Sequence, residues 1–534
     1  MHLILRNSPL SREIVIGVVG FAGAGCSTVI KRLRVLLENA SYEVRPLKLS
    51  DLIAQRFPDR DIVRVEDGIK SGETKFRRAC QLQDLGDELR NKHERYAVAS
   101  LAVAEIIKQR GAAAAGEGRI AYLLDSIKHQ DEVELLRRVY DQSFRLVAIH
   151  CERSTRELRL VGSNTSSAKY AGVAKTAVYS YMERDEKDKS RRYGQQVRDA
   201  FYLADYFLDN NTKAENGANL NGDLQRFVDL LLESALVRPT RNERAMYHAH
   251  AAARQSACLS RQVGAAIMAP DGTVVATGAN DVPKFGGGVY EEGAKEDHRC
   301  HVWEWSGDGP IFKGCHNNRK KNGLRREIGA WLANTLASKL AELAHPPSSF
   351  KGDPAAAART DAQRKIENFL RADPDVLDEM PGIKDLIEFS RSIHAEMNAL
   401  FAAARNGFSP MGATLFCTTY PCHNCARHLV TAGIRQVFFI EPYVKSLATE
   451  LHEDAISTVA PDPEKPLNKM AVVPFTGVGP RMYEDFFTKR AELKAADGAF
   501  ALPAHGVPAY AVRLRALGKV EEQAAALVSE SNDV

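Results

Sequence analysis

The chain has 534 residues, 44% of them hydrophobic, and its 72 basic residues nearly balance 68 acidic ones, giving a net charge of +4. This composition is typical of a globular protein with two or three domains, and so weak a charge gives no support for nucleic-acid binding. The absence of any run of 18 apolar residues, together with the polar breaks in the first 20 residues, predicts a chain without a membrane span or signal peptide. Nine scattered cysteines favour a reducing, cytoplasmic location over a disulfide framework.

The first 238 residues alternate between short apolar runs, typical of strands, and longer amphipathic runs, typical of helices. Strands are expected over residues 13–20, 43–49, 119–127, 144–151 and 206–210. Helices are expected from residue 27, across 76–110 and over 224–236. This alternation predicts an α/β fold with a doubly wound parallel sheet.

A glycine-rich loop joins the first expected strand to the first expected helix. This context indicates a Walker A phosphate loop, in which backbone N–H groups hold phosphates and a Ser or Thr hydroxyl reaches Mg²⁺. The predicted nucleotide-binding residues are Gly20, Gly23, Gly25, Cys26, Ser27, Thr28 and Asp125. Cys26 takes the position of the usual lysine, so nucleotide binding is expected with little phosphoryl transfer. A glycine-rich turn that merely allows close packing is the alternative.

Two further sequence features of the first domain are a segment that resembles a lid and the linker at its end. Arg184 and Asp185, in "MERDEKD", resemble a lid. The stretch "VRPTRNER" is expected to be the linker, which ends a kinase-like domain at residue 238. Residues 239–490 then predict a second α/β/α domain, followed by an extension over 491–534. The second domain opens with a helix and two strands, which an Asp271-Gly272 turn joins.

Two short strings in the second domain contain the residues of a metal centre. "HAEMNAL" begins at His394, and "PCHNC" ends at Cys425. His394, Cys422 and Cys425 can hold Zn²⁺ while leaving a fourth position for water, and Glu396 is placed to move protons. This H-x-E…P-C-x-x-C pattern is the signature of zinc-dependent nucleobase deaminases. In such an enzyme, water adds to C4 of a cytosine ring. The alternatives are a structural zinc ribbon and a coincidental C-x-x-C.

Candidate substrate contacts lie after the strands that flank this motif. Asn280 resembles the asparagine with which deaminases bind the sugar 3′-hydroxyl, and Tyr443 has the position at which such enzymes contact the sugar or base. Lys445 and Arg481 are predicted to hold phosphates. The alternatives are a turn residue for Asn280 and ordinary surface charges for the two cations.

A long insertion, residues 284–390, separates these elements. Its first part concentrates five possible ligands for a second, structural zinc: His298, Cys300, His301, Cys315 and His316. A histidine-rich loop without metal is the alternative. Further on, apolar residues that include Trp331 and Leu336 share one helix face, which core packing or an oligomer interface would explain.

Several strings spread over most of the chain resemble one protein family. They are "LQDLGDELR", "LLDSIKHQDEVELLR", "MERDEKD", "YGQQVRDAFYLADYF", "SRQVGAAI", "GANDVPKFGGG" and "IEPYVKSLA". With the zinc motif and the lysine-less P-loop, they resemble bacterial anti-phage deoxycytidine nucleotide deaminases, in which a P-loop kinase-like domain is fused to a deoxycytidylate deaminase domain. The resemblance implies conversion of dCTP and dCMP to deoxyuridine nucleotides and, in some members, an inhibitory small RNA. The lysine-less P-loop further predicts a first domain that binds nucleotide and regulates the deaminase, and a homo-oligomer is also expected.

Two other function classes share parts of this pattern. A polynucleotide cytidine editor has the same zinc motif, but it would need a basic, aromatic groove, and aromatic residues make up only 7% of the chain. A nucleotide kinase with an accessory deaminase domain would need the P-loop lysine, which Cys26 replaces.

Overall fold

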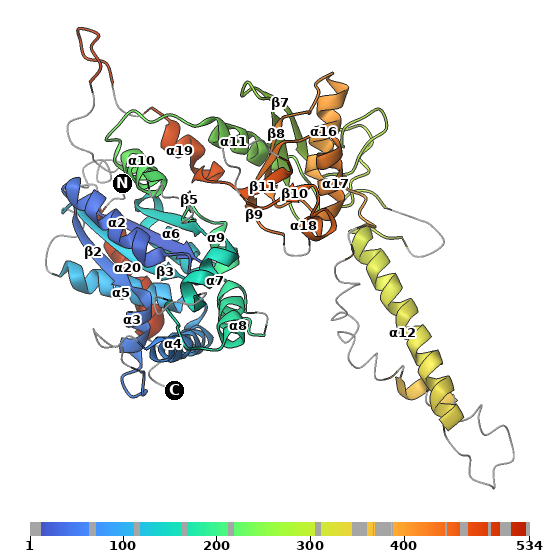
Figure 1. The fold of residues 1–534 in the computed structure, drawn as a ribbon, viewed down its shortest axis with the longest axis horizontal. Coiled ribbons are helices and arrows are strands. Elements are labelled where there is room, and N and C mark those ends of the chain that lie inside the picture. The colour runs from blue at the N-terminus through green and yellow to red at the C-terminus, as the bar shows by residue number, and fades with distance from the viewer. Residues whose placement is uncertain are drawn as a thin grey trace. The chain divides into compact units, whose positions relative to one another are not determined.

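The chain forms two compact units, Met1–Tyr247 together with Pro474–Val534, and His248–Val473. The elements of both units are labelled in Figure 1. The computed structural model describes residues 12–63, 71–111, 118–162, 168–188, 190–211, 218–304, 311–343, 360–361, 363–366, 368, 386, 388–443, 446–459, 468–489, 493–501 and 514–529.

A six-stranded sheet forms the centre of the first unit, in the order β12-β5-β4-β1-β3-β2. Its strands are β1 (Ile14–Gly20), β2 (Glu43–Lys48), β3 (Ile120–Ile127), β4 (Phe144–His150), β5 (Tyr206–Asp209) and β12 (Gly477–Val478). Strands β2 to β5 run parallel to their neighbours, and short β12 joins the edge antiparallel to β5. From β1, strands β4 and then β5 follow on one side, and β3 and then β2 follow on the other, so the chain winds to both sides of β1. This order confirms the predicted doubly wound α/β fold.

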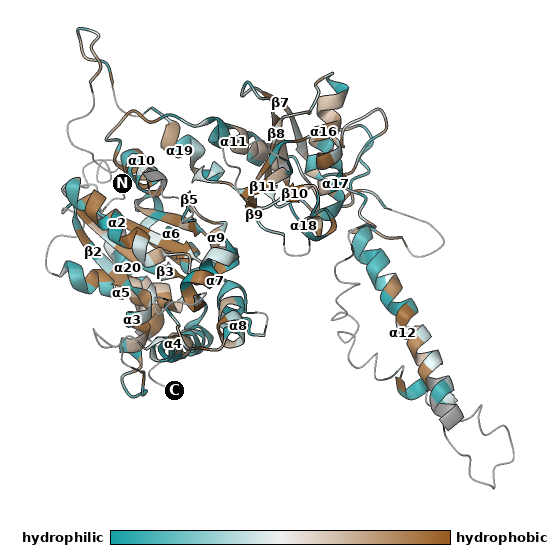
Figure 2. Ribbon diagram, viewed as in Figure 1, coloured by the Kyte–Doolittle hydropathy of each residue, from teal (hydrophilic) through white to brown (hydrophobic). Residues whose placement is uncertain are grey.

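Helices complete the first unit. They are α2 (Cys26–Asn39), α3 (Leu49–Arg56), α4 (Gly72–His93), α5 (Ala97–Arg110), α6 (Gln130–Tyr140), α7 (Arg153–Val161), α8 (Lys175–Glu186), α9 (Val197–Phe201), α10 (Ala218–Leu232), α19 (Tyr483–Phe487) and α20 (Leu514–Ser529). Helices α2 and α10 share one buried apolar cluster with β1, β3 and β4. Figure 2 shows hydrophobic residues recurring along α2 and the central strands, as burial of these elements requires.

The predicted helix over residues 76–110 is two helices. α4 ends at His93 and α5 begins at Ala97, because Glu94 between them has a φ of 74°, which no α-helix accommodates. The units also differ from the predicted domain boundaries. The division falls after Tyr247, inside α11 (Arg241–Ala253), and residues 474–534 return to the first unit.

The return of the C-terminal residues to the first unit rests on α20, which packs against α5 and α6. Arg110 of α5 forms buried ion pairs with Glu13 and with Glu521 of α20, at 2.6 and 2.7 Å. Each carboxylate accepts two N–H groups of the guanidinium fork, which satisfies these buried charges. Ala-rich α20 is therefore part of the α/β core.

The second unit contains another six-stranded sheet, in the order β10-β11-β9-β8-β6-β7. Its strands are β6 (Gly264–Met268), β7 (Val274–Ala279), β8 (Thr414–Thr419), β9 (Gln436–Glu441), β10 (Ile456–Ser457) and β11 (Met470–Pro474). Strands β6 and β7 form the predicted hairpin, and Gly272 in its turn has a φ of 93°. Strand β8 pairs antiparallel with β6 and parallel with β9.

Helices α12 (His316–Leu343), α16 (Ala395–Arg405), α17 (His423–Thr431) and α18 (Ala448–Leu451) also belong to the second unit. On α12, Trp331 and Leu336 are 63% and 46% exposed, so core packing does not explain these two residues. Nowhere in the described part of the chain is a helix both long and apolar enough to span a bilayer.

Candidate active site

Two helix N-termini bring three metal-type ligands together in the second unit. His394 lies directly before α16, and Cys422 lies directly before α17, with Cys425 in its first turn. The Cys422 thiol accepts a hydrogen bond from the backbone N–H of Cys425, so it also caps α17. Strand β8 ends at Thr419, and the Pro421-Cys422 segment joins it to α17. The end of the strand therefore places both cysteines at the start of the helix.

The three ligand atoms fit one tetrahedral metal ion. His394 Nδ1 lies 3.2 Å from Cys422 Sγ and 3.3 Å from Cys425 Sγ, and all three atoms lie within 4.8 Å of one another. In a zinc site, a nitrogen and a sulfur ligand lie about 3.5 Å apart. The donor set of one imidazole and two thiols is one that zinc prefers, and it leaves a coordination position for water.

The surroundings of these ligands stabilise a thiolate. Hydrogen bonding from the Cys425 thiol and from the His394 ring lowers the pKa of Cys422 to about 4. Hydrogen bonding with Cys422 in turn raises the pKa of His394 to about 9. The N-termini of α16 and α17 carry partial positive charge, which stabilises the thiolate form of the cysteines. Thiolates can in turn bind a metal cation.

Glu396 is a buried carboxyl group beside these ligands. It lies in the first turn of α16, two residues after His394, and only 4% of it is exposed. Burial, with a smaller contribution from the charge on Cys422, raises the pKa of Glu396 to about 7. A buried carboxyl group beside the three ligands can accept a proton and return it, which is the role that the sequence predicts.

A glycine on the neighbouring strand sets the position of α16. A Cβ atom on Gly278 of β7 would lie 2.4 Å from the Ala399 nitrogen and 2.5 Å from the Ala395 oxygen. The absence of a side chain therefore lets the helix backbone lie directly against β7. Asn398 of α16 fixes the same contact by donating a hydrogen bond to the Ala279 carbonyl oxygen.

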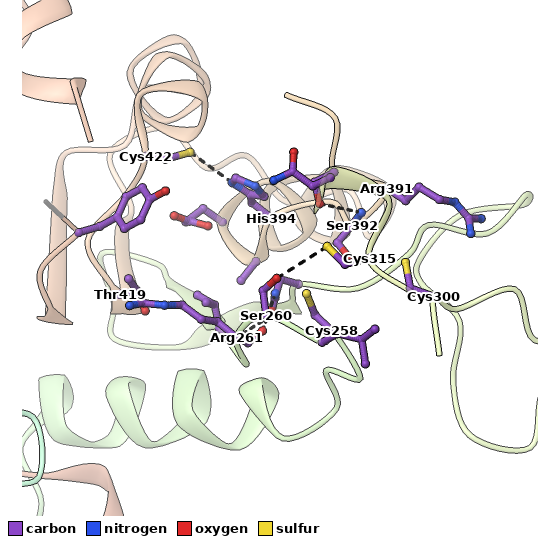
Figure 3. Close-up of a pocket in the computed structure, with 18 of the residues that line it drawn as sticks. Cys258, Ser260, Arg261, Cys300, Cys315, Arg391, Ser392, His394, Thr419 and Cys422 are labelled. Atoms are coloured by element: carbon purple, nitrogen blue, oxygen red, sulfur yellow. Dashed lines mark hydrogen bonds between the residues drawn. The ribbon is translucent and has the colours of Figure 1, made fainter. Parts of the chain in front are cut away.

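A cavity of about 190 Å³ opens beside His394, Glu396 and Cys422. Figure 3 shows the side chains that line it, with the Cys422 sulfur directed at the His394 ring. Other lining residues come from the segment before β6, from the segment between β7 and α12, from the start of α12 and from the ends of β7, β8 and β9: Cys258, Leu259, Ser260, Arg261, Val263, Asn280, Cys300, Cys315, His316, Asn317, Thr419, Tyr420 and Tyr443.

The predicted substrate contacts have different outcomes. Asn280 and Tyr443 line the cavity. The Asn280 amide accepts a hydrogen bond from Val263 N–H and donates one to the Arg261 carbonyl, so it also holds this cavity wall in place. Arg481 lies in the first unit and does not line the cavity, and Lys445 lies outside the described residues.

Sequence reasoning missed two cationic residues of the cavity. Arg261, three residues before the start of β6, is half exposed and pairs with Glu441 at 3.0 Å. Arg391, three residues before His394, stacks over the Trp303 ring at 4.2 Å. The available signal for Arg261 was its position just before β6, the strand that pairs with β8, which leads to Cys422. The available signal for Arg391 was its position in sequence, three residues before His394.

The structure does not assemble the predicted second metal site. Among the described residues, His394, Cys422 and Cys425 are the one group with three suitable donor atoms so close together. The His316 ring instead stacks on Trp303, and the His298 ring packs near Trp303 and Tyr290. Aromatic packing thus accounts for two of the five predicted ligands, while Cys300 and Cys315 line the cavity beside His394 and His301 is exposed.

The predicted P-loop residues line a separate cavity of about 540 Å³ in the first unit. Gly20, Gly23, Gly25, Cys26, Ser27, Thr28 and Asp125 all contribute to its wall. The Ser27 hydroxyl donates to an Asp125 carboxylate oxygen at 2.8 Å, so the two predicted Mg²⁺-binding side chains are adjacent. Gly23 and Gly25 have φ values of 86° and 95°, which glycine adopts freely.

Comparisons with known proteins find similarity to one protein family over part of the chain. Residues 239–441 match the family model of the cytidine and deoxycytidylate deaminase zinc-binding region. Over 80 residues the chain is 40% identical to deoxycytidylate deaminase of Enterobacteria phage T4, which covers 15% of this chain and 42% of that protein. Over 71 residues it is 41% identical to ComE operon protein 2 of Bacillus subtilis (strain 168), covering 13% and 38%. The chain thus spans less than half the length of either relative.

Two solved structures resemble parts of the chain at low identity. The dCMP deaminase of cyanophage S-TIM5, in complex with dCMP and dUMP, covers 45% of this chain and 99% of its own, with 17% identity and a TM-score of 0.22. Shikimate kinase from Bacteroides thetaiotaomicron covers 41% of this chain and 98% of its own, with 14% identity and a TM-score of 0.24.

Proposed function

We propose that this chain, whose residues 239–441 match the cytidine and deoxycytidylate deaminase zinc-binding region, hydrolytically deaminates deoxycytidine nucleotides with one bound zinc ion. The observation that carries the proposal is the buried carboxyl group of Glu396 beside three convergent ligands, at the wall of a cavity. The names of two relatives, the deoxycytidylate deaminases of phages T4 and T2, support dCMP as a substrate class.

The proposed mechanism assigns each proton to a residue of the chain. The chemistry that zinc supplies, when held by His394, Cys422 and Cys425, is Lewis acidity that lowers the pKa of a water molecule. Glu396 accepts the proton that this water loses and delivers it to N3 of the cytosine ring. The oxygen of this water forms a bond to C4 of the ring. Glu396 then carries the second proton of the water to the exocyclic amine, the C4–N bond breaks, and ammonia leaves a uracil ring with C4 as a carbonyl.

The remaining cavity residues are proposed to select the nucleotide. Arg261 and Arg391 supply positive charge near the cavity, suited to the 5′-phosphates of dCMP or dCTP. Tyr443 and Asn280 are proposed to contact the base and sugar, since both line the same wall as Glu396. Asn280 would also act indirectly, because its side chain holds the backbone of residue 261.

The direct test is to incubate the purified chain with dCTP, dCMP, CTP and cytosine-containing single-stranded DNA, and to measure uracil products. We expect dUTP or dUMP to form and the polynucleotide to remain unchanged. A chelator should abolish the reaction, and added Zn²⁺ should restore it. Deamination of DNA or RNA without deamination of free nucleotides would instead identify a polynucleotide editor.

The biological role that we propose is anti-phage defence in the bacterial cytoplasm, by removal of dCTP and dCMP during phage replication. Mass spectrometry of nucleotide pools after infection should show deoxycytidine nucleotides falling in cells with the parent chain and unchanged in cells with Glu396→Ala. Without infection we expect no depletion, since an inhibitory small RNA is proposed to hold the enzyme inactive. Unchanged pools in infected cells would contradict this role.

We further propose that the active form is a homo-oligomer in which exposed Trp331 and Leu336 of α12 contribute to the interface. Light scattering should give a mass that is a multiple of 58.9 kDa for the parent chain. A double Trp331→Glu and Leu336→Glu variant should have a lower mass if α12 contributes, because buried charge disfavours association. A monomeric parent chain contradicts the proposal.

A further inference from the structure

The P-loop of the first unit lacks its own cation. Cys26 begins α2 at the position where a Walker A loop carries lysine, and 8% of it is exposed. Burial raises the pKa of the Cys26 thiol to about 11, even though the charge of Lys128 acts in the opposite direction. The thiol is therefore neutral at physiological pH and contributes no positive charge to a phosphate group.

A lysine from another strand lies at the same loop. Lys128 directly follows β3, which pairs in parallel with β1, so the carboxyl ends of both strands meet at the P-loop edge of the sheet. The Lys128 ammonium lies 3.4 Å from the carbonyl oxygen of Gly20, the last residue of β1, and it lines the P-loop cavity. Residues that are 108 positions apart in sequence thus share one site.

A carboxylate occupies the donors that a phosphate would use. Asp185 of α8 is 1% exposed, and its Oδ2 accepts a hydrogen bond from the P-loop backbone N–H of Ala22 at 2.7 Å. Its Oδ1 pairs with the Lys128 ammonium, also at 2.7 Å. One loop N–H and one lysine ammonium are the combination with which P-loops bind phosphate oxygens. Asp185 therefore imitates an anion that is bound in the loop.

The rest of the cavity is suited to a larger anion than one carboxylate. Lysines and arginines outnumber the two aspartates, Asp125 and Asp185, among the lining residues. Burial disfavours charge on Lys128, but the neighbouring carboxylates outweigh it and raise the pKa of Lys128, so the ammonium is protonated. The adjacent Ser27 hydroxyl and Asp125 carboxylate have the chemistry to hold a divalent cation that accompanies a phosphate chain.

We propose that Lys128 replaces the missing P-loop lysine in a site for the phosphate chain of a nucleoside polyphosphate, and that Asp185 holds this site until the phosphates displace it. The site is separate from the deaminase-type cavity and needs no deamination to be detected. Asp185 belongs to the segment that resembles a lid, so its release from Lys128 and Ala22 would couple phosphate binding to movement of α8.

Calorimetry on the full-length chain, with MgATP and separately with inorganic pyrophosphate, tests this inference. We expect both probes to bind and Lys128→Met to weaken binding at least ~10-fold, because one charge-assisted phosphate contact is lost. Lys128→Arg should retain binding. Lys31→Met, on the exposed surface of α2, is the matched control and should bind like the parent. Unchanged binding by Lys128→Met, or no binding by the parent chain, would overturn the proposal.

Two more variants test the replacement and the displacement separately. Adding Cys26→Lys to Lys128→Met should restore binding, because a cation then occupies the usual P-loop position. Asp185→Asn should bind pyrophosphate about 3- to 10-fold more tightly, because the competing negative charge is removed. Weaker binding by Asp185→Asn, in a variant whose circular dichroism matches the parent, would show that Asp185 supports the site and would contradict displacement.

Discussion

The zinc-type site of the second unit and the P-loop cavity of the first unit are both built where strands end and helices begin, yet they are assembled differently. The ligands of the zinc-type site come from two local motifs, each fixed by the first turn of one helix. The P-loop keeps its local backbone but takes its cation from Lys128 of another strand. A site that is built from local motifs can be found in sequence, whereas a site completed from a distant strand cannot.

Glu396→Ala should have the largest effect on the locally built site. We expect deamination to fall by ~10²–10⁴ or more, because the residue that moves both protons is lost. Zinc content, measured by mass spectrometry of the purified protein, should stay at the parent level since the three ligands remain. Glu450→Ala, on exposed α18 of the same unit, is the control and should retain activity. Parent-like turnover by Glu396→Ala would contradict the mechanism.

Glu521→Ala should have the largest effect on the stability of the first unit. The change leaves buried Arg110 with Glu13 alone, and removal of one partner from a buried ion pair costs about 3–5 kcal/mol. The free energy of unfolding of the first unit, measured in urea, should fall by that amount. Substitution of the exposed neighbouring residue, Glu522→Ala, should change this free energy little. Zinc content should not change in either variant. Equal stability of the two variants would show that α20 does not support this unit.

Gly278→Ala tests how closely α16 must lie against β7. The added Cβ would contact backbone atoms of Ala395 and Ala399 at 2.4–2.5 Å, which forces α16 to move. We expect a loss of about 1–3 kcal/mol in the free energy of unfolding, with lower turnover, because Glu396 lies on this helix. In Gly323→Ala, no heavy atom lies within 4 Å of the new Cβ, so stability should be unchanged or higher. Parent-like stability and turnover of Gly278→Ala would show that the contact is not required.

Arg261→Gln should have the smallest effect of the four. If Arg261 binds substrate phosphate, KM for dCMP should rise about 10-fold while kcat changes little, because a charge-assisted hydrogen bond is lost from substrate binding. KM for deoxycytidine, which has no phosphate, should stay the same. A parallel rise in KM for both substrates would indicate that the change disturbs the cavity wall rather than phosphate recognition.

The sequence by itself determined the α/β fold of both units and the composition of the zinc-type site. Apolar runs and their spacing identify most strands, and the helix pitch fixes how His394, Glu396 and the two cysteines project from their helices. Gly23 and Gly25 were recognisable because only a few residue types adopt a positive φ in such a loop.

Only the tertiary structure decided which distant charges meet. Strand order places Lys128 beside Gly20, and α20 brings Glu521 to Arg110 across 411 residues. It also placed Arg261 in the cavity and Arg481 in the other unit, and it packed His298 and His316 against Trp303 instead of gathering a second metal site. Local motifs are fixed by short-range backbone geometry, but charges from separate elements meet only when the packing of whole sheets and helices is known.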